Sequence, residues 1–130
     1  MSKPLFSEEL RAFIKNRIQT VLRLEILLLL HDKQPRSFNA AEVAEELSFE
    51  TEATQEQLSA LEEIGLAVQS PIGESRYRYH PADETLRSAV EQLAAAYSTQ
   101  RVPVLSVILA DASHRSRLFA EAFRIIRRND

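Results

Sequence analysis

The sequence predicts a single, mainly α-helical domain that carries one small two-stranded β-hairpin. Gly occurs only twice in 130 residues, which disfavours an all-β chain with many tight turns. Apolar residues recur every three or four positions through most of the chain, as expected for amphipathic helices. The exception lies between residues 66 and 80, where a turn-like "SPIGES" separates two short segments typical of strands.

Composition excludes several classes of protein. The absence of Cys removes disulfides, thiolate zinc sites and a cysteine nucleophile. The most apolar run, Val21 to Leu30, is interrupted by Arg23 and Glu25, and a membrane span needs about 20 apolar residues. No signal-peptide pattern is visible at the N-terminus. We therefore expect a cytoplasmic protein with no membrane partner.

In the N-terminal third of the chain, the sequence predicts a helix that begins after Ser7. The Ser7 hydroxyl can cap it by accepting a hydrogen bond from a backbone N–H of the first turn. Its apolar face continues to about His31, after which charged residues and Pro35 end it. The pattern leaves open whether residues 7–31 form one helix or two, broken near residues 16–20.

Two short helices are predicted next. Asn39, followed three residues later by Glu42, has the spacing of a capping box and starts the first. A tight connection over residues 48–54 leads to the second, which extends to Ile64. Gly65 then supplies the left-handed residue that a helix C-cap needs.

The rest of the chain predicts two strands and further helices. The strands are Leu66–Gln69 and Arg76–His80, and Asp83 then caps a long helix. Pro103 is tolerated in a first turn and opens another short helix. The apolar run after it would also suit a strand, but the neighbouring helices favour a helix. Ser113 caps a final basic helix.

The order of these elements, with "LEEIGL" at residues 61–66 and "GESRYRYHP" at residues 73–81, resembles a known family. From about Asn16 to Leu93 the chain is similar to bacterial winged helix-turn-helix transcription regulators of the multiple-antibiotic-resistance-regulator (MarR) type. The resemblance implies one domain over residues 1–130, with a winged-helix core at about 16–97. It also implies a homodimer, with the helix at 7–20 and the helices at 103–128 as dimerisation extensions.

The resemblance also implies a DNA-binding site. In this family the second helix of the motif lies in the major groove. Carried over by position, Thr51, Gln55 and Ser59 would sample bases, and Glu52 and Glu56 share that part of the helix. The wing follows, where Arg76 and Arg78 alternate with tyrosines.

The wing arginines are the candidate phosphate contacts of such a site. If Tyr77 and Tyr79 pack inward, Arg76 and Arg78 are both exposed and able to bind phosphate. The alternative is that the arginines pair with glutamates of the same domain.

The charge of the middle segment departs from the family pattern. Residues 36–69 contain one basic and eight acidic residues, a net charge of −7. Most affinity for DNA comes from neutralising phosphates. Two hypotheses follow: a dimeric regulator that binds duplex DNA through the wing, or a winged-helix interaction module. In the second, Glu52 and Glu56 contact a protein partner with a basic patch, without direct DNA binding.

Other chemistry is not indicated. The histidines His31, His80 and His114 have no companion motif for a metal, and no nucleophile elbow or Gly-rich phosphate loop is present. We expect neither enzyme activity nor a metal or cofactor. Five arginines in the last predicted helix suit a nucleic-acid arm, a solvated face or a partner for the acidic segment: Arg115, Arg117, Arg124, Arg127 and Arg128.

Overall fold

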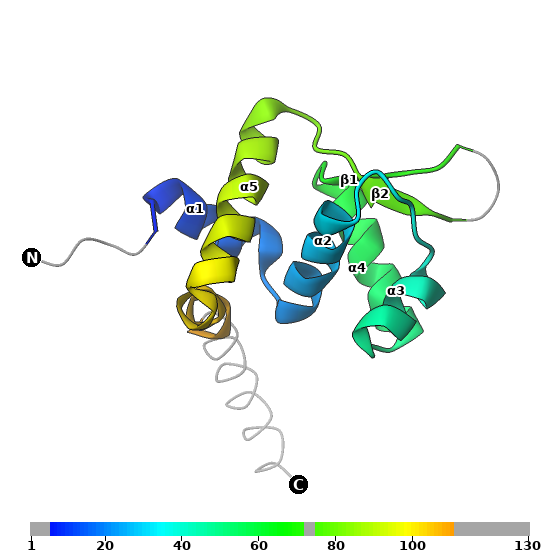
Figure 1. The fold of residues 1–130 in the computed structure, drawn as a ribbon, viewed down its shortest axis with the longest axis horizontal. Coiled ribbons are helices and arrows are strands. Elements are labelled where there is room, and N and C mark those ends of the chain that lie inside the picture. Colours follow the sequence, from blue (N-terminus) through cyan, green and yellow to red (C-terminus); the bar gives the residue numbers. More distant parts are fainter. Residues whose placement is uncertain (1–5, 72–74, 111–130) are drawn as a thin grey trace, which may run out of the picture.

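The computed structural model describes residues 6–71 and 75–110, which are mostly helical with one two-stranded antiparallel sheet (Figure 1). This confirms the helical class with a small hairpin. The predicted helix at 114–128 lies outside the described residues. The elements are α1 (Glu8–Phe13), the π-helical η1 (Ile14–Ile18), α2 (Val21–Asp32), α3 (Ala40–Leu47), α4 (Thr51–Glu63), β1 (Ala67–Gln69), β2 (Tyr77–Tyr79), α5 (Glu84–Thr99) and a last helix Arg101–Ala110.

Residues 8–32 form two helical segments rather than one: α1 continues directly into η1, and α2 follows after a break. Ser7 caps α1 as predicted, with its Oγ accepting from the backbone N–H of Leu10 at 3.1 Å. After η1 the chain turns at Gln19, which has a φ of 68°. Thr20 then starts α2 by accepting from the backbone N–H of Arg23 at 3.1 Å. The break therefore lies at Gln19 and Thr20, inside the stretch where the sequence allowed one.

The predicted capping box of α3 is present. Asn39 Oδ1 accepts from the backbone N–H of Glu42 at 2.8 Å, and Glu42 Oε1 accepts from the backbone N–H of Asn39 at 3.0 Å. α3 ends at Leu47, and its C-cap residue Ser48 has a left-handed φ of 60°. Because α4 already begins at Thr51, the connection is shorter than the predicted stretch of 48–54.

The hairpin pairs Ala67 with Tyr79 and Gln69 with Tyr77, and both strands are shorter than predicted. Phe38, just before α3, joins the free edge of β2. Its N–H donates to the carbonyl of Tyr77 at 2.8 Å, and the Tyr77 N–H returns a bond of the same length. The segment before α3 thereby covers the edge of a sheet that would otherwise leave backbone groups unpaired.

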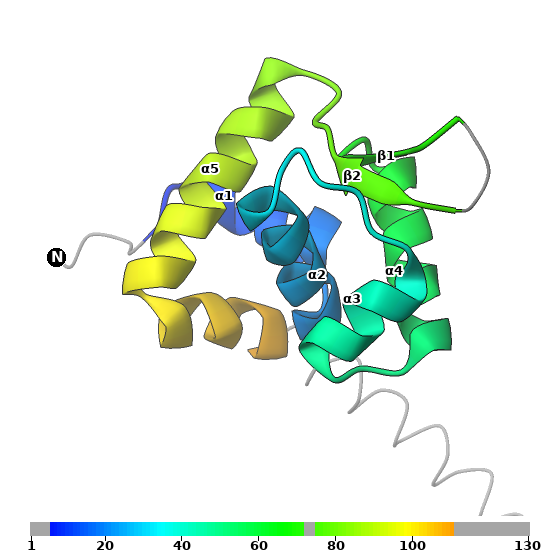
Figure 2. The same ribbon diagram turned by 45° about the vertical axis from the view of Figure 1, so that its right-hand side comes forward.

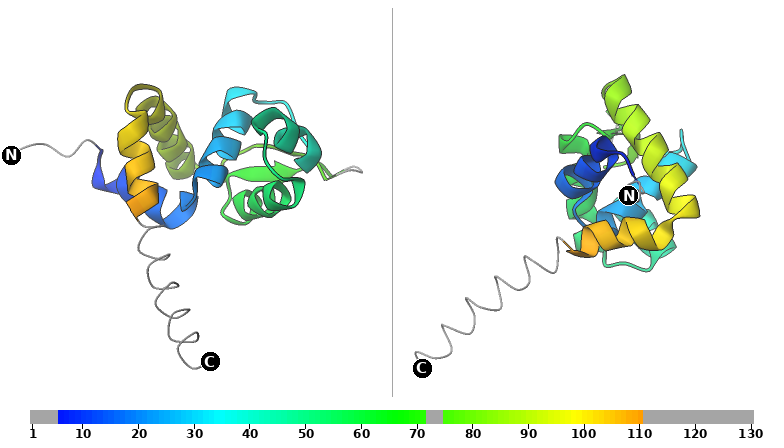
Figure 3. Two further views of the ribbon diagram at one scale, coloured as in Figure 1. Left: turned by 90° about the horizontal axis from the view of Figure 1, so that it is seen from below. Right: turned by 90° about the vertical axis from the view of Figure 1, so that its left-hand side faces the viewer.

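α2 lies at the centre of the molecule. Its buried side chains are Leu24, Ile26, Leu27 and Leu30, and it packs against α3, α4 and β2. Figure 2 shows α2 enclosed by α5 on one side and by α3, α4 and the hairpin on the other. The view from below in Figure 3 shows two groups, with α1, α5 and the last helix separated by α2 from α3, α4 and the sheet.

The C-terminal described helices confirm two predictions. Asp83 caps α5 by accepting from the backbone N–H of Leu86 at 2.8 Å. The apolar run after Pro103 is helical, although the helix begins two residues earlier, at Arg101. In the described part of the chain no single helix suffices in length and apolarity to cross a membrane. Only α5 together with Arg101–Ala110 meets those criteria, as a pair bent by 114°.

Gly65 ends α4 as predicted, with a φ of 85°. A Cβ at this position would lie 3.2 Å from Ala82 Cβ and 3.4 Å from Leu86 Cδ1. Any L side chain there meets both a strained backbone and a close neighbour.

We predict that Gly65→Ala lowers the free energy of unfolding by about 1–2 kcal/mol, because the left-handed conformation is costly for Ala. Gly65→Asn is the matched control, since it adds a Cβ but tolerates this conformation better. Urea unfolding monitored by circular dichroism measures both. Equal losses in the two variants would show that crowding, not the backbone conformation, sets the cost.

Candidate binding surface of helix α4

Helix α4 has one buried and one exposed face. Thr54, Leu58 and Leu61 are buried against the rest of the domain, and Thr54 Oγ1 donates to the carbonyl of Glu50 at 2.8 Å. The exposed face carries Thr51, together with most of the helix's glutamates. α4 contains no Lys, Arg or His, so its charge is negative along its whole length.

Two of the three predicted base-contacting residues are engaged inside the protein. The side-chain amide of Gln55 donates to the Tyr77 hydroxyl at 2.9 Å and to Ser59 Oγ at 3.2 Å. Gln69 donates to the same Tyr77 hydroxyl at 2.9 Å. Gln55 and Ser59 are half-buried, while Thr51 is exposed. The amide of Gln55 therefore holds α4 against the hairpin rather than facing solvent.

This polar cluster of Gln55, Gln69 and Tyr77 was missed by sequence reasoning, which assigned Gln55 to base contact and Tyr77 to packing alone. A signal for it was present. A core-facing Tyr in a strand keeps a hydroxyl that needs a hydrogen-bond partner when buried. Gln69, its cross-strand partner, and a Gln on the preceding helix are residues that can supply one.

The two wing arginines differ. Tyr77 and Tyr79 are buried as expected, and Arg78, between them, is exposed. Its backbone pairs with Val68 in the hairpin, but its side chain has no ion-pair or hydrogen-bond partner in the described ranges. Arg76 is half-buried, so the expectation that both arginines are exposed holds only for Arg78. The Arg76 guanidinium lies 2.9 Å from Glu42 Oε1 and donates to the Ser37 carbonyl at 3.0 Å. The alternative of pairing with a glutamate of the same domain is confirmed for Arg76.

Glu42 is held in its ionised form at this pair. The backbone N–H of Asn39, followed by the charges of Arg76 and Arg36, keeps the pKa of Glu42 below its ordinary value. Arg36 also stacks on the Phe38 ring, 4.6 Å from the ring centroid. Two basic residues beside α3 are thus occupied by interactions within the domain.

The exposed carboxylates of α4 and its cap residue form what we call the α4 acidic face. None of them has an ion pair with a described residue, although Glu62 accepts a long hydrogen bond of 3.4 Å from Gln69. Glu45 and Glu46 on α3 are also exposed but line a groove with Lys33 and Arg36. The α4 acidic face consists of Glu50, Glu52, Glu56, Glu62 and Glu63.

The α4 acidic face is electrostatically unfavourable on its own. Glu52 and Glu56 are one turn apart, and like charges at that spacing destabilise a helix by about 0.2–0.5 kcal/mol. Glu62 and Glu63 lie in the last turn, where the helix dipole disfavours negative charge. Only Glu50 and Glu52, at the N-terminal end, are placed favourably. A cationic partner would relieve each of these costs.

Arg23 is the cation that contacts α4 from the core side. Its Nε donates to Gln57 Oε1 at 2.8 Å, and its NH1 donates to the carbonyl of Arg17 at 2.7 Å. Burial lowers the pKa of Arg23, but a guanidinium stays charged. Because it binds an amide and a carbonyl, Arg23 neutralises no carboxylate of the α4 acidic face.

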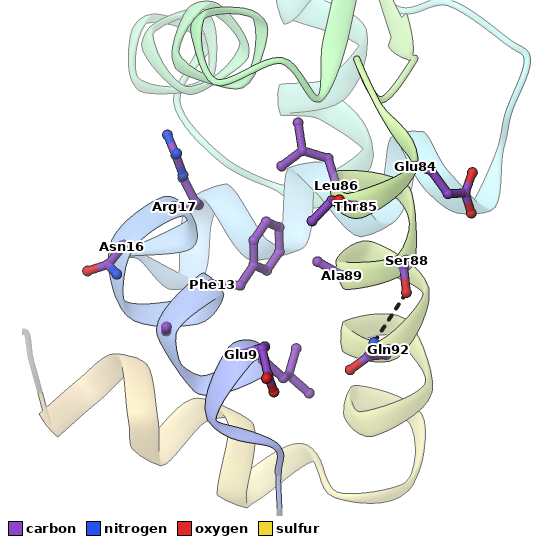
Figure 4. A pocket seen from close by; sticks show the side chains of 12 residues that line it. Glu9, Phe13, Asn16, Arg17, Glu84, Thr85, Leu86, Ser88, Ala89 and Gln92 are labelled. Atoms are coloured by element: carbon purple, nitrogen blue, oxygen red, sulfur yellow. Dashed lines mark hydrogen bonds between the residues drawn. The ribbon is translucent and has the colours of Figure 1, made fainter.

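A separate groove of about 610 Å³ lies between α1, η1 and α5 (Figure 4). Its apolar part includes Leu10, Phe13, Leu86 and Ala89, and Figure 4 shows Phe13 and Leu86 pointing into the space between the helices. Charged and amide side chains form its polar lining, among them Glu9 of α1, Arg17 of η1, and Glu84 and Gln92 of α5. No pattern in the sequence indicates this groove.

The histidines within the described ranges do not assemble a metal site. His31 Nε2 lies 2.7 Å from Glu91 Oε1, and its ring packs edge-on to Tyr79 with 5.2 Å between centroids. His80 is exposed, and His114 lies outside these ranges. No group of three or more potential metal ligands occurs in the part of the chain that the structure describes.

We predict that the free energy of unfolding falls less between neutral and acid pH in Glu42→Gln than in the wild type. A lowered pKa means that Glu42 contributes stability above the ordinary pKa of a glutamate and loses it as the pH falls through the folded-state value. Gln keeps an oxygen for the Asn39 N–H, so the change mainly removes the charge. Urea unfolding between about pH 7 and about pH 3 tests this. An acid profile of Glu42→Gln that is unchanged from wild type would contradict the assignment.

Comparisons of this chain with protein-family models, with curated proteins and with solved structures found no match. The geometry of the described residues, and above all the α4 acidic face, is therefore what bears on function.

Proposed function

We propose that this chain is a winged helix-turn-helix regulatory module that binds a basic surface of another protein through the α4 acidic face. One observation carries the proposal: α4 presents to solvent carboxylates that form no ion pair with any described residue, while Gln55, a side chain able to contact bases, is hydrogen-bonded to Tyr77. The winged-helix assignment is supported by the order α2, α3, tight turn, α4, hairpin and α5. The pairing of Phe38 with Tyr77 supports it further, because it places the start of α3 beside the hairpin.

Electrostatics favours a protein over DNA as the partner of α4. Duplex DNA carries one negative charge per about 1.7 Å of its axis, and binding depends on neutralising phosphates. Five carboxylates at the position of a base-contacting helix oppose this attraction. The same carboxylates attract a patch of Lys and Arg, and complementary charge speeds association and selects the partner.

A homodimer is part of this proposal. The exposed large apolar side chains recorded in the described ranges are Val102 (71% exposed) and Leu109 (52% exposed), both in the helix Arg101–Ala110. A groove of about 400 Å³ beside Val102 is lined by Phe6, by residues of α1 and η1, and by residues of that helix, including Val107. Apolar surface of this kind, on and next to the predicted dimerisation extensions, supports self-association.

We predict that Glu52→Gln combined with Glu56→Gln weakens binding to a fluorescent Lys/Arg-rich model peptide. Two exposed ion pairs, at about 0.2–1 kcal/mol each, correspond to a loss of about 2- to 30-fold. Fluorescence anisotropy at about 50 mM salt measures it, where charge interactions are weakly screened. Glu8→Gln with Glu84→Gln, the same charge change outside α4, should leave the affinity near wild type. Tight binding of duplex DNA by the wild type at this salt would contradict the proposal.

The second candidate function is a dimeric transcription regulator that binds duplex DNA. The exposed, unpartnered Arg78 favours it, together with the exposed Arg11, Lys15 and Arg17 of α1 and η1. In this candidate Arg78 contacts phosphate and Thr51 samples bases. Arg76, Gln55 and Ser59 would first have to leave their partners within the domain.

For this candidate we expect Arg78→Ala to weaken duplex binding about equally for all DNA sequences. The slope of log affinity against log salt concentration should fall by about one, the amount for one lost phosphate contact. Arg87→Ala is the matched control, since Arg87 is an exposed arginine of α5 near Glu84. Titrations at several salt concentrations give the slope. Glu52→Gln with Glu56→Gln should strengthen DNA binding here, the opposite of its effect on peptide binding.

A further inference from the structure

We propose that the groove between α1, η1 and the helix Arg101–Ala110 binds a small amphipathic carboxylate. The carboxylate group lies on Arg11 and Lys15, and the apolar chain lies along the helix. The inference goes beyond the proposed function, because this groove and α4 lie on opposite sides of α2 (Figure 3). It assigns the chain a small-molecule site in addition to its proposed partner surface.

The groove presents positive charge that no described residue neutralises. Arg11 and Lys15 are both exposed, and neither forms an ion pair with a described residue. They lie four residues apart on one side of a helix, a spacing at which like charges repel. None of the described residues that line the groove carries a carboxylate. A bound carboxylate would relieve the repulsion, and it can accept two parallel hydrogen bonds from the guanidinium of Arg11.

The opposite wall of the groove is mainly apolar. The last described helix lines it at positions 102, 103, 106, 107 and 110, the pattern of one helix face. Val102, Val107 and the preceding Phe6 supply large apolar side chains, and Ser106 adds a hydroxyl. Val102 is 71% exposed, so this wall leaves apolar surface in water. A hydrocarbon chain laid along the helix would cover that surface, which favours binding.

The size of the groove suits a single small molecule. Its volume of about 400 Å³ falls in the range of about 300–1,000 Å³ that is typical of small-molecule sites. Such sites are mainly apolar and carry a few placed polar groups. The larger groove of Figure 4 differs, because its lining carries charges of both signs, Glu9 and Arg17 among them. The smaller groove is therefore the one that selects an anion.

The backbone at Lys15 supports the same location. Lys15 belongs to η1, a π-helical turn that follows α1 without a break. Turns of this kind are rare in proteins and occur frequently at functional sites. This observation does not depend on the charge of the groove, and it indicates a functional role for the segment that carries one of the two cations.

Isothermal titration calorimetry with hexanoate, octanoate and decanoate, below the concentrations at which they form micelles, tests the site. We expect the affinity to rise about 2- to 4-fold per added methylene, because each methylene buries further apolar surface. Octanamide has the chain length of octanoate without its charge and should bind several-fold more weakly. An affinity that depends on neither chain length nor head-group charge would overturn the proposal.

Substitutions of the two cations test their role. Arg11→Gln with Lys15→Gln should weaken octanoate binding by about 2- to 30-fold, the loss of two exposed ion pairs. Lys33→Gln with Arg87→Gln makes the same charge change at exposed positions outside the groove and should leave the affinity unchanged. Arg11→Glu with Lys15→Glu should reverse the preference, so that octylamine binds more tightly than octanoate.

Circular dichroism establishes that each of these variants is folded. Equal octanoate affinity in the wild type and in Arg11→Gln with Lys15→Gln would overturn the proposal. The same holds if the charge-reversed variant still prefers octanoate to octylamine.

A second copy of the chain and an anionic membrane are the other occupants to distinguish. Leu109 is exposed on the same helix but does not line the groove. Leu109→Ser should therefore leave octanoate binding unchanged, whatever its effect on self-association measured by sedimentation. Loss of octanoate binding in this variant would show a site that needs two chains and would overturn the proposal. Binding to phosphatidylglycerol vesicles without binding of dissolved octanoate would overturn it as well.

Discussion

The hydroxyl and backbone of Tyr77 hold together the three segments that form the candidate surface. The hydroxyl accepts from Gln55 on α4 and from Gln69 on β1, and the backbone pairs with Phe38 just before α3. With its ring buried at 1% exposure, Tyr77 fixes how α4 is turned about its axis. That rotation keeps Gln55 inward and leaves Glu52 and Glu56 exposed. The exposed side of α4 is therefore negative partly because the hydrogen bond between Gln55 and Tyr77 holds the polar, uncharged Gln55 on the side that faces the hairpin.

Local signals predicted the mainly helical class and the ends of its helices well. The cap residues Ser7, Asn39 and Asp83 and the left-handed Gly65 were identified correctly because each acts within a few residues of the chain. The contacts within the candidate surface were predicted only in part, because they join residues far apart in the sequence. Arg76 and Glu42, or Gln55 and Tyr77, are brought together by packing of α3 and α4 on the hairpin. A charge count shows that a segment is acidic but not which carboxylates remain without a cation.

The two candidate functions make opposite electrostatic demands on α4. A helix that binds a nucleic acid gains affinity from cationic side chains, which neutralise phosphates. A helix that binds a basic protein gains affinity and specificity from anionic side chains. Here the cations near α3 are used within the domain, where Arg76 binds Glu42 and Arg36 stacks on Phe38. Arg78 alone keeps a free charge in the described part of the hairpin. The charge that this surface presents to solvent thus depends on which arginines are paired within the domain as much as on the number of arginines.

Arg23 gives the molecule a mechanical connection between its two halves. One guanidinium bonds both the side chain of Gln57 on α4 and the carbonyl of Arg17 at the end of η1, and Arg17 also lines the groove beside α5. Gln19, with its positive φ, follows that turn directly. The groove beside α5 and the helix that carries the acidic face are therefore joined by a short route of two hydrogen bonds through one side chain.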